Sequence, residues 1–285
     1  MMGWGILGAI GSGIKACASA AWSGIKSVGT AVASFAGSAI SAFGKMIGGK
    51  AGAFMSLVGG IVSGPLGGIL GPIIGQIIIK VLVKAVEKLA KMLGVIKEED
   101  NTEELGYRIE EANKEENKHW KQKEEFNTLA EYYDYLKRQI PDEKINYDRL
   151  KQNRDFYAVV GMAAETAAIE EELKITLPPT FLFEAAKSRM EAEEIRAFAD
   201  AFRGLGYDSV DVLDYFKGRM APGEAKRITE AIIASLKAYC KEENESKLYT
   251  RLGEMQAIAR DDNKLKEVYK KEIAEVNEKQ QIPEM

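Results

Sequence analysis

The hydrophobic positions of this chain concentrate in its first third, and the remainder mixes charged and apolar residues with a helical period. Residues 51–79 contain no charged side chain, and Lys50 and Lys80 bracket them. As one helix rising about 1.5 Å per residue, this stretch would exceed the hydrocarbon thickness of a bilayer, about 30 Å. Pro65 and Pro72 interrupt it, and each favours a kink or a turn. We therefore expect residues 51–79 to span a membrane once, to form a helical hairpin, or to stay buried in protein.

An amphipathic helix is predicted after the second proline. Its apolar positions recur at helical spacing: Ile77, Ile78, Val81, Leu82, Ala85, Leu89, Met92 and Leu93. The opposite face carries four lysines, spaced four, four and three residues apart: Lys80, Lys84, Lys88 and Lys91. A basic amphipathic helix of this kind is typical of helices that lie on anionic membranes. The same pattern fits a helix that covers a protein core, so both interpretations stay open.

Glycine is concentrated in the same region, because residues 1–95 hold 20 of the 27 glycines. Several of these glycines are spaced four residues apart, which places small residues along one face of a helix. Such ridges let apolar helices approach closely in a bilayer. We predict that one set of glycines mediates membrane insertion or helix packing: Gly60, Gly64, Gly67, Gly68, Gly71 and Gly75. A further series comprises Gly44, Gly48 and Gly52.

The charge is divided unevenly along the chain. Residues 1–95 contain eight lysines and one acidic residue, Glu87, and therefore carry a net charge of +7. The remaining residues contain 31 basic and 42 acidic side chains, a net charge of −11, and the whole chain carries −4. This asymmetry indicates a basic end that meets an anionic surface and an acidic end that stays in water.

Residues 96–285 form a second, acidic domain of soluble helices in this interpretation, after a boundary marked by the charge run at 97–100. Helices are predicted from residue 102 to Pro141, with a break near 123, then from 144 to 174, and at 180–188, 190–204, 209–219, 222–242 and 246–280. No alternating strand pattern is present. The predicted fold is all-α, with Gly/Ala-rich hydrophobic N-terminal helical segments followed by a multi-helix bundle. Aromatic residues should supply much of its core: Phe181, Phe183, Phe198, Phe202, Tyr207, Tyr215 and Phe216.

The sequence contains no recognisable catalytic motif. Its single histidine, His119, follows Glu116 at the spacing of half a di-iron site, but that site needs a second such motif. Cys17 and Cys240 are the only cysteines, so a disulfide framework or a four-cysteine zinc site is not expected. No glycine cluster has the ending of a phosphate loop, and the acidic second domain disfavours nucleic-acid binding. We expect no enzymatic activity, no cofactor and no bound metal.

The apolar N-terminus does not read as a secretory signal peptide. No basic residue precedes its apolar run, and Lys15 interrupts that run. We expect a protein made in the bacterial cytoplasm and then secreted or delivered to a target membrane.

The composition of the first 95 residues resembles the glycine-zipper heads of some bacteriocin-like and secretion-system-delivered antibacterial toxins, a resemblance that transfers no site residue. It implies a membrane-inserting effector of the pore-forming type, delivered by a type VI secretion system or a phage-like contractile injection machine. Expected partners are a lipid bilayer, further copies of the chain or a chaperone or delivery-machine protein covering residues 1–95, and an immunity protein. One alternative is a phage virion or tube-lumen protein that engages the host envelope. Another is an interaction protein whose hydrophobic head is buried on a partner.

Overall fold

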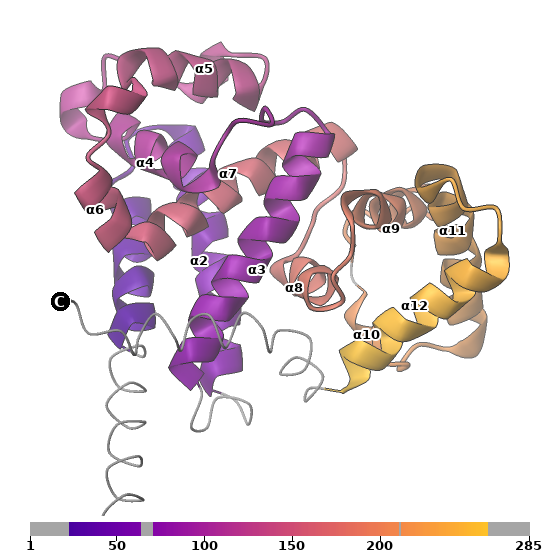
Figure 1. Ribbon diagram of the computed structural model, residues 1–285. Helices are drawn as coiled ribbons and strands as arrows, with labels where there is room; N and C mark the ends of the chain where they lie inside the picture. The colour runs from indigo at the N-terminus through magenta and orange to yellow at the C-terminus, as the bar shows by residue number, and fades with distance from the viewer. Residues whose placement is uncertain (1–22, 64–70, 211, 262–285) are drawn as a thin grey trace, which may run out of the picture.

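The computed structural model describes residues 23–63, 71–210 and 212–261, and the regular elements of these residues are helices joined by turns and loops (Figure 1). The prediction of an all-α fold is therefore confirmed. Among the described residues, extended backbone pairing is limited to one bridge, between Thr176 and Ser209.

The helices follow one another with connections of varied length. Helical residues 23–38 precede two long apolar helices, α2 (Ala42–Ser63) and α3 (Gly71–Met92). The helices that follow are α4 (Thr102–Ala112), α5 (Leu129–Gln139), α6 (Tyr147–Gln152), α7 (Arg154–Leu173), α8 (Pro179–Lys187), α9 (Ala192–Gly204), α10 (Leu213–Phe216), α11 (Pro222–Cys240) and α12 (Glu245–Arg260). Three short 3₁₀ turns lie between them: η2 (Glu115–Asn117), η3 (Lys123–Glu125) and η4 (Asp142–Lys144).

Short polar side chains set several helix starts. Asn101 accepts a hydrogen bond from the backbone N–H of Glu104 and caps α4. Thr128 caps α5 in the same way, through the N–H of Glu131. The predicted helix from residue 102 is wrong beyond Ala112, because residues 113–128 form turns and 3₁₀ segments instead. That stretch is dense in charge and offers few apolar residues to bury, so helix formation there would gain little from packing.

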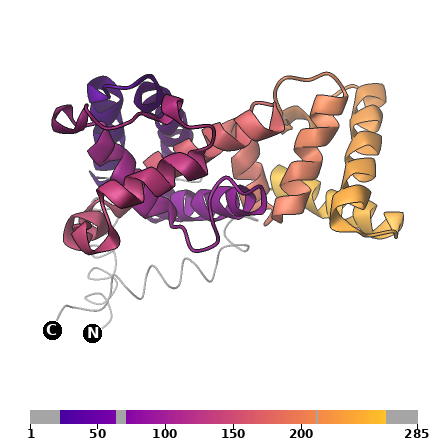
Figure 2. The ribbon, with the colours of Figure 1, turned by 90° about the horizontal axis from the view of Figure 1, so that it is seen from above.

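Helix α3 lies at the centre of the molecule. The helices α2 and α4–α6 lie on one side of it and α8–α12 on the other, and α7 crosses it (Figures 1 and 2). It packs against α2, α7, α8 and α9. Its buried apolar residues face more than one direction: Ile77, Ile78, Ile79, Val81, Leu82, Val83, Ala85, Val86, Leu89 and Ala90. The described residues on both sides of the predicted boundary at residue 96 thus contribute to one hydrophobic core.

The C-terminal group of helices has an aromatic core. Phe181, Phe198 and Phe216 form a row of neighbouring rings, with centroids 6.2 Å and 5.5 Å apart along the row. Six of the seven aromatic residues predicted for this core are buried, and Tyr207 is partly buried against it.

Two glycines permit the closest helix crossing, between α4 and α7. A Cβ atom on Gly106 would overlap the carbonyl oxygen of Tyr157, and one on Gly161 would overlap that of Thr102. Both positions therefore require glycine for the backbones to come this near.

Candidate functional site: the apolar hairpin and its contacts

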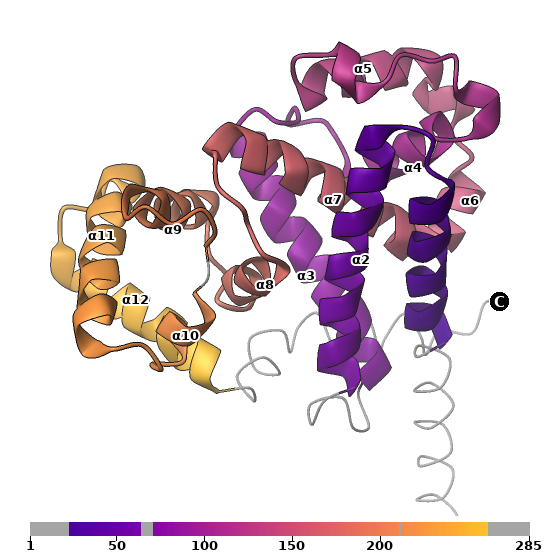
Figure 3. The same cartoon turned by 180° about the vertical axis from the view of Figure 1, so that it is seen from behind.

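The strongest candidate site is the helical hairpin formed by residues 23–63, in which helical residues 23–38 lie beside α2 (Figure 3). One face of this hairpin is apolar and packs against α7 and α3. The ring of Phe35 meets Phe156 edge-on at 6.3 Å between centroids, and Phe43 meets Tyr132 at 5.8 Å. The buried side chains are Ile25, Val32, Phe35, Ala39, Phe43, Ile47, Ala51, Phe54, Met55, Val58 and Val62.

The other face of α2 is open to solvent and consists mainly of small residues. Its exposed positions are Ala42, Lys45, Met46, Gly49, Ala53, Ser56, Gly60 and Ser63. Met46 is 44% exposed, one of three exposed large hydrophobic side chains among the described residues. By length and composition α2 is the one helix of the described residues that suffices to cross a membrane, and 39% of its most apolar window is buried. The core helix of a soluble protein meets the same criterion. The feature that separates α2 from such a helix is its solvent-exposed face.

The N-terminus of α2 is held by Ser41 of the hairpin and by polar groups from the rest of the protein. Ser41 accepts a hydrogen bond of 2.8 Å from the N–H of Gly44, and its hydroxyl donates to Oδ1 of Asn113 over 3.0 Å. The N–H of Phe43 donates to Oε1 of Glu124 over 2.9 Å. The free N–H groups of a first helical turn need such acceptors, and a carboxylate there also faces the positive end of the helix dipole. The capping of α2 therefore depends on residues beyond the hairpin.

A charged contact fastens the middle of α2. The ammonium of Lys50 pairs with Oε2 of Glu170 on α7, and the other oxygen of that carboxylate accepts from the N–H of Leu177 over 2.9 Å. The side chains of Lys50 and Glu170 are 25% and 15% exposed, so the pair is partly shielded from water. One carboxylate thereby joins the hairpin, α7 and the connection to α8.

The predicted packing glycines fall in different surroundings. Gly75 is buried, and a Cβ atom there would lie 2.8 Å from Cδ1 of Ile25 and 3.2 Å from Cγ2 of Val62. Gly60 is exposed, with open space around it. Gly71 begins α3, and Gly64, Gly67 and Gly68 lie outside the described residues.

The closest approach inside the hairpin uses a glycine from the other series. A Cβ atom on Gly48 would lie 2.6 Å from Cα of Ala36, so this glycine lets α2 and residues 23–38 cross at short distance. Gly44 of the same series leaves room for the side chain of Asn113, whereas Gly52 has open space. Spacing identified these positions but did not predict which of them would meet a neighbour.

The four predicted lysines lie along one edge of α3. Lys84 and Lys88 are exposed, and Lys80 and Lys91 are partly buried. Lys88 pairs with Glu191 at 2.7 Å and Lys91 with Glu87 at 2.6 Å. The apolar faces of α3 are covered by neighbouring helices. In this structure α3 is therefore an amphipathic helix packed in the hydrophobic core.

A buried polar cluster, which the sequence analysis missed, joins α3, α4 and α7. Glu165 has no exposed surface, and its Oε1 lies 2.8 Å from the hydroxyl oxygen of Thr102. The same hydroxyl oxygen lies 3.2 Å from Oε2 of Glu87, which pairs through Oε1 with Lys91. The available signal was a single acidic residue within the apolar middle of α7, between Phe156 and Ile169.

Burial raises the pKa of Glu165 well above the usual value, since an apolar interior disfavours the charged carboxylate. For Lys91, burial opposes the charge, but the hydrogen bond and the charge of Glu87 outweigh it and raise the pKa. The cluster therefore combines a carboxyl that favours its neutral form with an ion pair at its edge.

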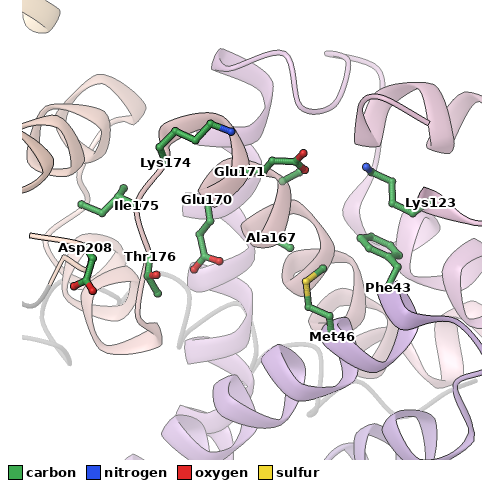
Figure 4. Close-up of a pocket in the computed structure, with 11 residues that line it drawn as sticks. Phe43, Met46, Lys123, Ala167, Glu170, Glu171, Lys174, Ile175, Thr176 and Asp208 are labelled. Carbon is green, nitrogen blue, oxygen red and sulfur yellow. The ribbon is translucent and has the colours of Figure 1, made fainter. Parts of the chain in front are cut away.

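A cavity of about 460 Å³ opens beside the start of α2 (Figure 4). Phe43 and Met46 from α2 and Lys123 from η3 line one side, and Glu170 and Asp208 lie farther across. Acidic and basic groups are mixed around this cavity. The described residues contain no group of three His, Cys, Asp or Glu side chains suited to a metal ion.

The histidine considered for a metal site has ordinary surroundings. His119 is exposed and lies in a turn after η2, not on the helix predicted there. Its ring contacts Trp120 edge-on at 6.4 Å between centroids.

Comparison of the chain with protein-family models, with curated proteins and with solved structures gives no match. The geometry of the hairpin therefore carries the functional argument.

Proposed function

We propose that this protein is a membrane-inserting effector or toxin of the pore-forming type, acting against bacteria after delivery by a secretion or phage-like contractile machine. The observation that carries the proposal is the hairpin. Its helix α2 has the length and composition of a membrane span, keeps one face in water, and is held to the remaining helices by its other face. The arrangement described above corresponds, in this proposal, to the state before insertion.

The energetics of α2 support this assignment. Its 22 residues extend about 33 Å as a helix, which matches a hydrocarbon core of about 30 Å. It carries two charged residues, Lys45 and Lys50, both in its first half. Insertion would exchange the packing of the inner face for lipid and would also remove the apolar part of the outer face from water. Small residues on that outer face suit close association of inserted helices.

The lysine edge of α3 supplies the approach to the membrane in this proposal. Lys84 and Lys88 are exposed on a helix that stays in the protein core. Each lysine near an anionic surface contributes about 1 kcal/mol of binding free energy. Binding would hold the molecule at the surface while the hairpin separates from α7.

A disulfide between Gly44→Cys and Asn113→Cys tests whether hairpin release is required. A Cβ atom on Gly44 would lie 2.7 Å from Cγ of Asn113, which places the two Cβ atoms within about 4 Å, a disulfide spacing. The variant is made in the full chain with Cys17→Ser and Cys240→Ser. We expect the oxidised protein to leave anionic liposomes intact and the reduced protein to release their dye. Equal release in both states would refute hairpin release.

The interaction protein is the second candidate, because Met46 is exposed on α2 beside the cavity. A partner that covers this face would replace the membrane. The reduced double-cysteine protein distinguishes the two functions, with the Cys17→Ser, Cys240→Ser protein as the control. Intact liposomes with both proteins would exclude the pore-forming type and favour the interaction protein.

A further inference from the structure

The contacts of Thr102 define how many protons the buried cluster holds. Its hydroxyl oxygen lies within hydrogen-bond distance of one oxygen of Glu165 and one oxygen of Glu87. A hydroxyl has a single hydrogen, so it donates to one of the two carboxyl groups. If the hydroxyl donates to the ionised Glu87, the shorter contact, to Glu165, needs its hydrogen from the Glu165 carboxyl, and a protonated Glu165 supplies it.

The second oxygen of Glu165 leads to the same conclusion. Oε2 is buried and has no hydrogen-bond partner among the described residues. A carboxylate anion in that position would be desolvated with little compensation, which strongly disfavours the ionised form. Glu87 differs, because its side chain is 26% exposed and it is paired with Lys91. The negative charge therefore belongs on Glu87 and the proton on Glu165.

We propose that Glu165 and Glu87 hold one proton between them through the Thr102 hydroxyl, so that α3 is fastened to α4 and α7 more firmly in acid than in alkali. Glu165 donates to the oxygen of Thr102, and the Thr102 hydroxyl donates to Glu87. Loss of the proton leaves two carboxylates around one hydroxyl, and their repulsion acts across the junction of the three helices. This device is independent of the proposed membrane activity.

The charged groups around the cluster determine how strongly the proton is held. On α3, Glu87 opposes ionisation of Glu165 and Lys91 favours it. On α4, Glu103 opposes it, and this acid is paired with Arg154 at 2.9 Å. On α5, Tyr133 is a buried neutral phenol coupled electrostatically to Glu165. Two acids and one base face the carboxyl, so the neighbouring charges add to the effect of burial.

The sign of the pH dependence follows from proton uptake. Unfolded Glu165 ionises near pH 4.3, whereas burial raises its pKa in the folded protein. Between these two pKa values the folded protein binds one proton more than the unfolded chain. The equilibrium constant for unfolding therefore rises about tenfold per pH unit from this group until the folded-state pKa is passed.

Glu165→Gln in the full chain is the first test, with Glu171→Gln, an exposed acid on the same helix, as the matched control. Chemical unfolding is measured from pH 5 to pH 9. As pH rises, the equilibrium constant for unfolding of the wild type and of the control should increase by up to about tenfold per pH unit relative to that of Glu165→Gln. If the free energy of unfolding depends on pH in the same way for the wild type and for Glu165→Gln, the proposal is overturned.

Infrared spectroscopy of the folded proteins tests the proton directly and does not depend on how well Glu165→Gln folds. The wild type should show the band of a protonated carboxyl at neutral pH, and the band should titrate away as pH rises. In Glu87→Gln the midpoint of this titration should move to lower pH. The negative charge of Glu87 raises the pKa of Glu165, and the substitution removes that charge. No band in the wild type, or an unchanged midpoint in Glu87→Gln, would contradict a shared proton.

Discussion

At the scale of single residues, the glycines that matter most for packing are Gly106 and Gly161, at the crossing of α4 and α7. The sequence pattern pointed instead to the glycine series of the first 95 residues. Of those, Gly48 and Gly75 do meet a neighbouring helix closely, while Gly60 does not. A lone glycine in a charged helix has no periodic signal, and its role depends on which helix crosses it. Tertiary packing therefore decides what spacing alone cannot.

The variant Gly106→Ala should destabilise the protein strongly. The added methyl group would overlap the carbonyl oxygen of Tyr157, and backbone atoms cannot rotate away. Helix separation should cost about 2–4 kcal/mol, in the range of severe core substitutions. Gly253→Ala in α12 is the control, because it has open space and should gain about 0.5–1 kcal/mol from helix propensity. Urea unfolding of both variants measures the difference, and equal effects would contradict a steric role.

At the scale of elements, most of the helices after residue 140 were predictable, and their ends were set by local residues. Pro222 begins α11, and Pro179, which follows Pro178, begins α8, as the preference of proline for the first helical turn predicts. The prediction of helix is wrong over residues 113–128, where the chain is dense in charge and has no apolar period. The contacts that hold the hairpin were not predictable either. Glu124 lies more than eighty positions from Phe43, and no local pattern links a distant acid to a helix N-terminus.

The variant Glu124→Gln should loosen the first turn of α2. It removes the carboxylate charge from the positive end of the helix dipole, a loss of about 0.3–1 kcal/mol. The backbone amides of this turn should then exchange with solvent faster, by a factor of about 2–5, while those of α11 stay unchanged. Glu116→Gln, an exposed acid in η2, provides the control. Hydrogen exchange read by mass spectrometry gives the comparison, and loosening in both variants would argue against a specific cap.

At the scale of the whole molecule, the charge asymmetry of the sequence reappears as contacts between its two parts. Lys50 of α2 pairs with Glu170, and Lys88 of α3 pairs with Glu191. The sequence indicated that a basic end would meet an anionic surface. In this structure the acidic helices provide part of that surface themselves. An anionic membrane would compete for the same lysines, which links the folded arrangement to the proposed insertion.

The central position of α3 leads to a prediction about how the molecule unfolds. Leu82 is fully buried on a helix that packs against α2, α7, α8 and α9. Leu82→Ala should cost about 2–5 kcal/mol, as buried leucine truncations do. Because α3 connects both groups of helices, hydrogen-exchange protection should fall in α7 and in α9 together. Leu248→Ala in α12 is the control, since α12 packs against α8, α10 and α11 and should lower protection only in the C-terminal group. Protection lost in α7 alone after Leu82→Ala would mean that the two groups unfold as separate units.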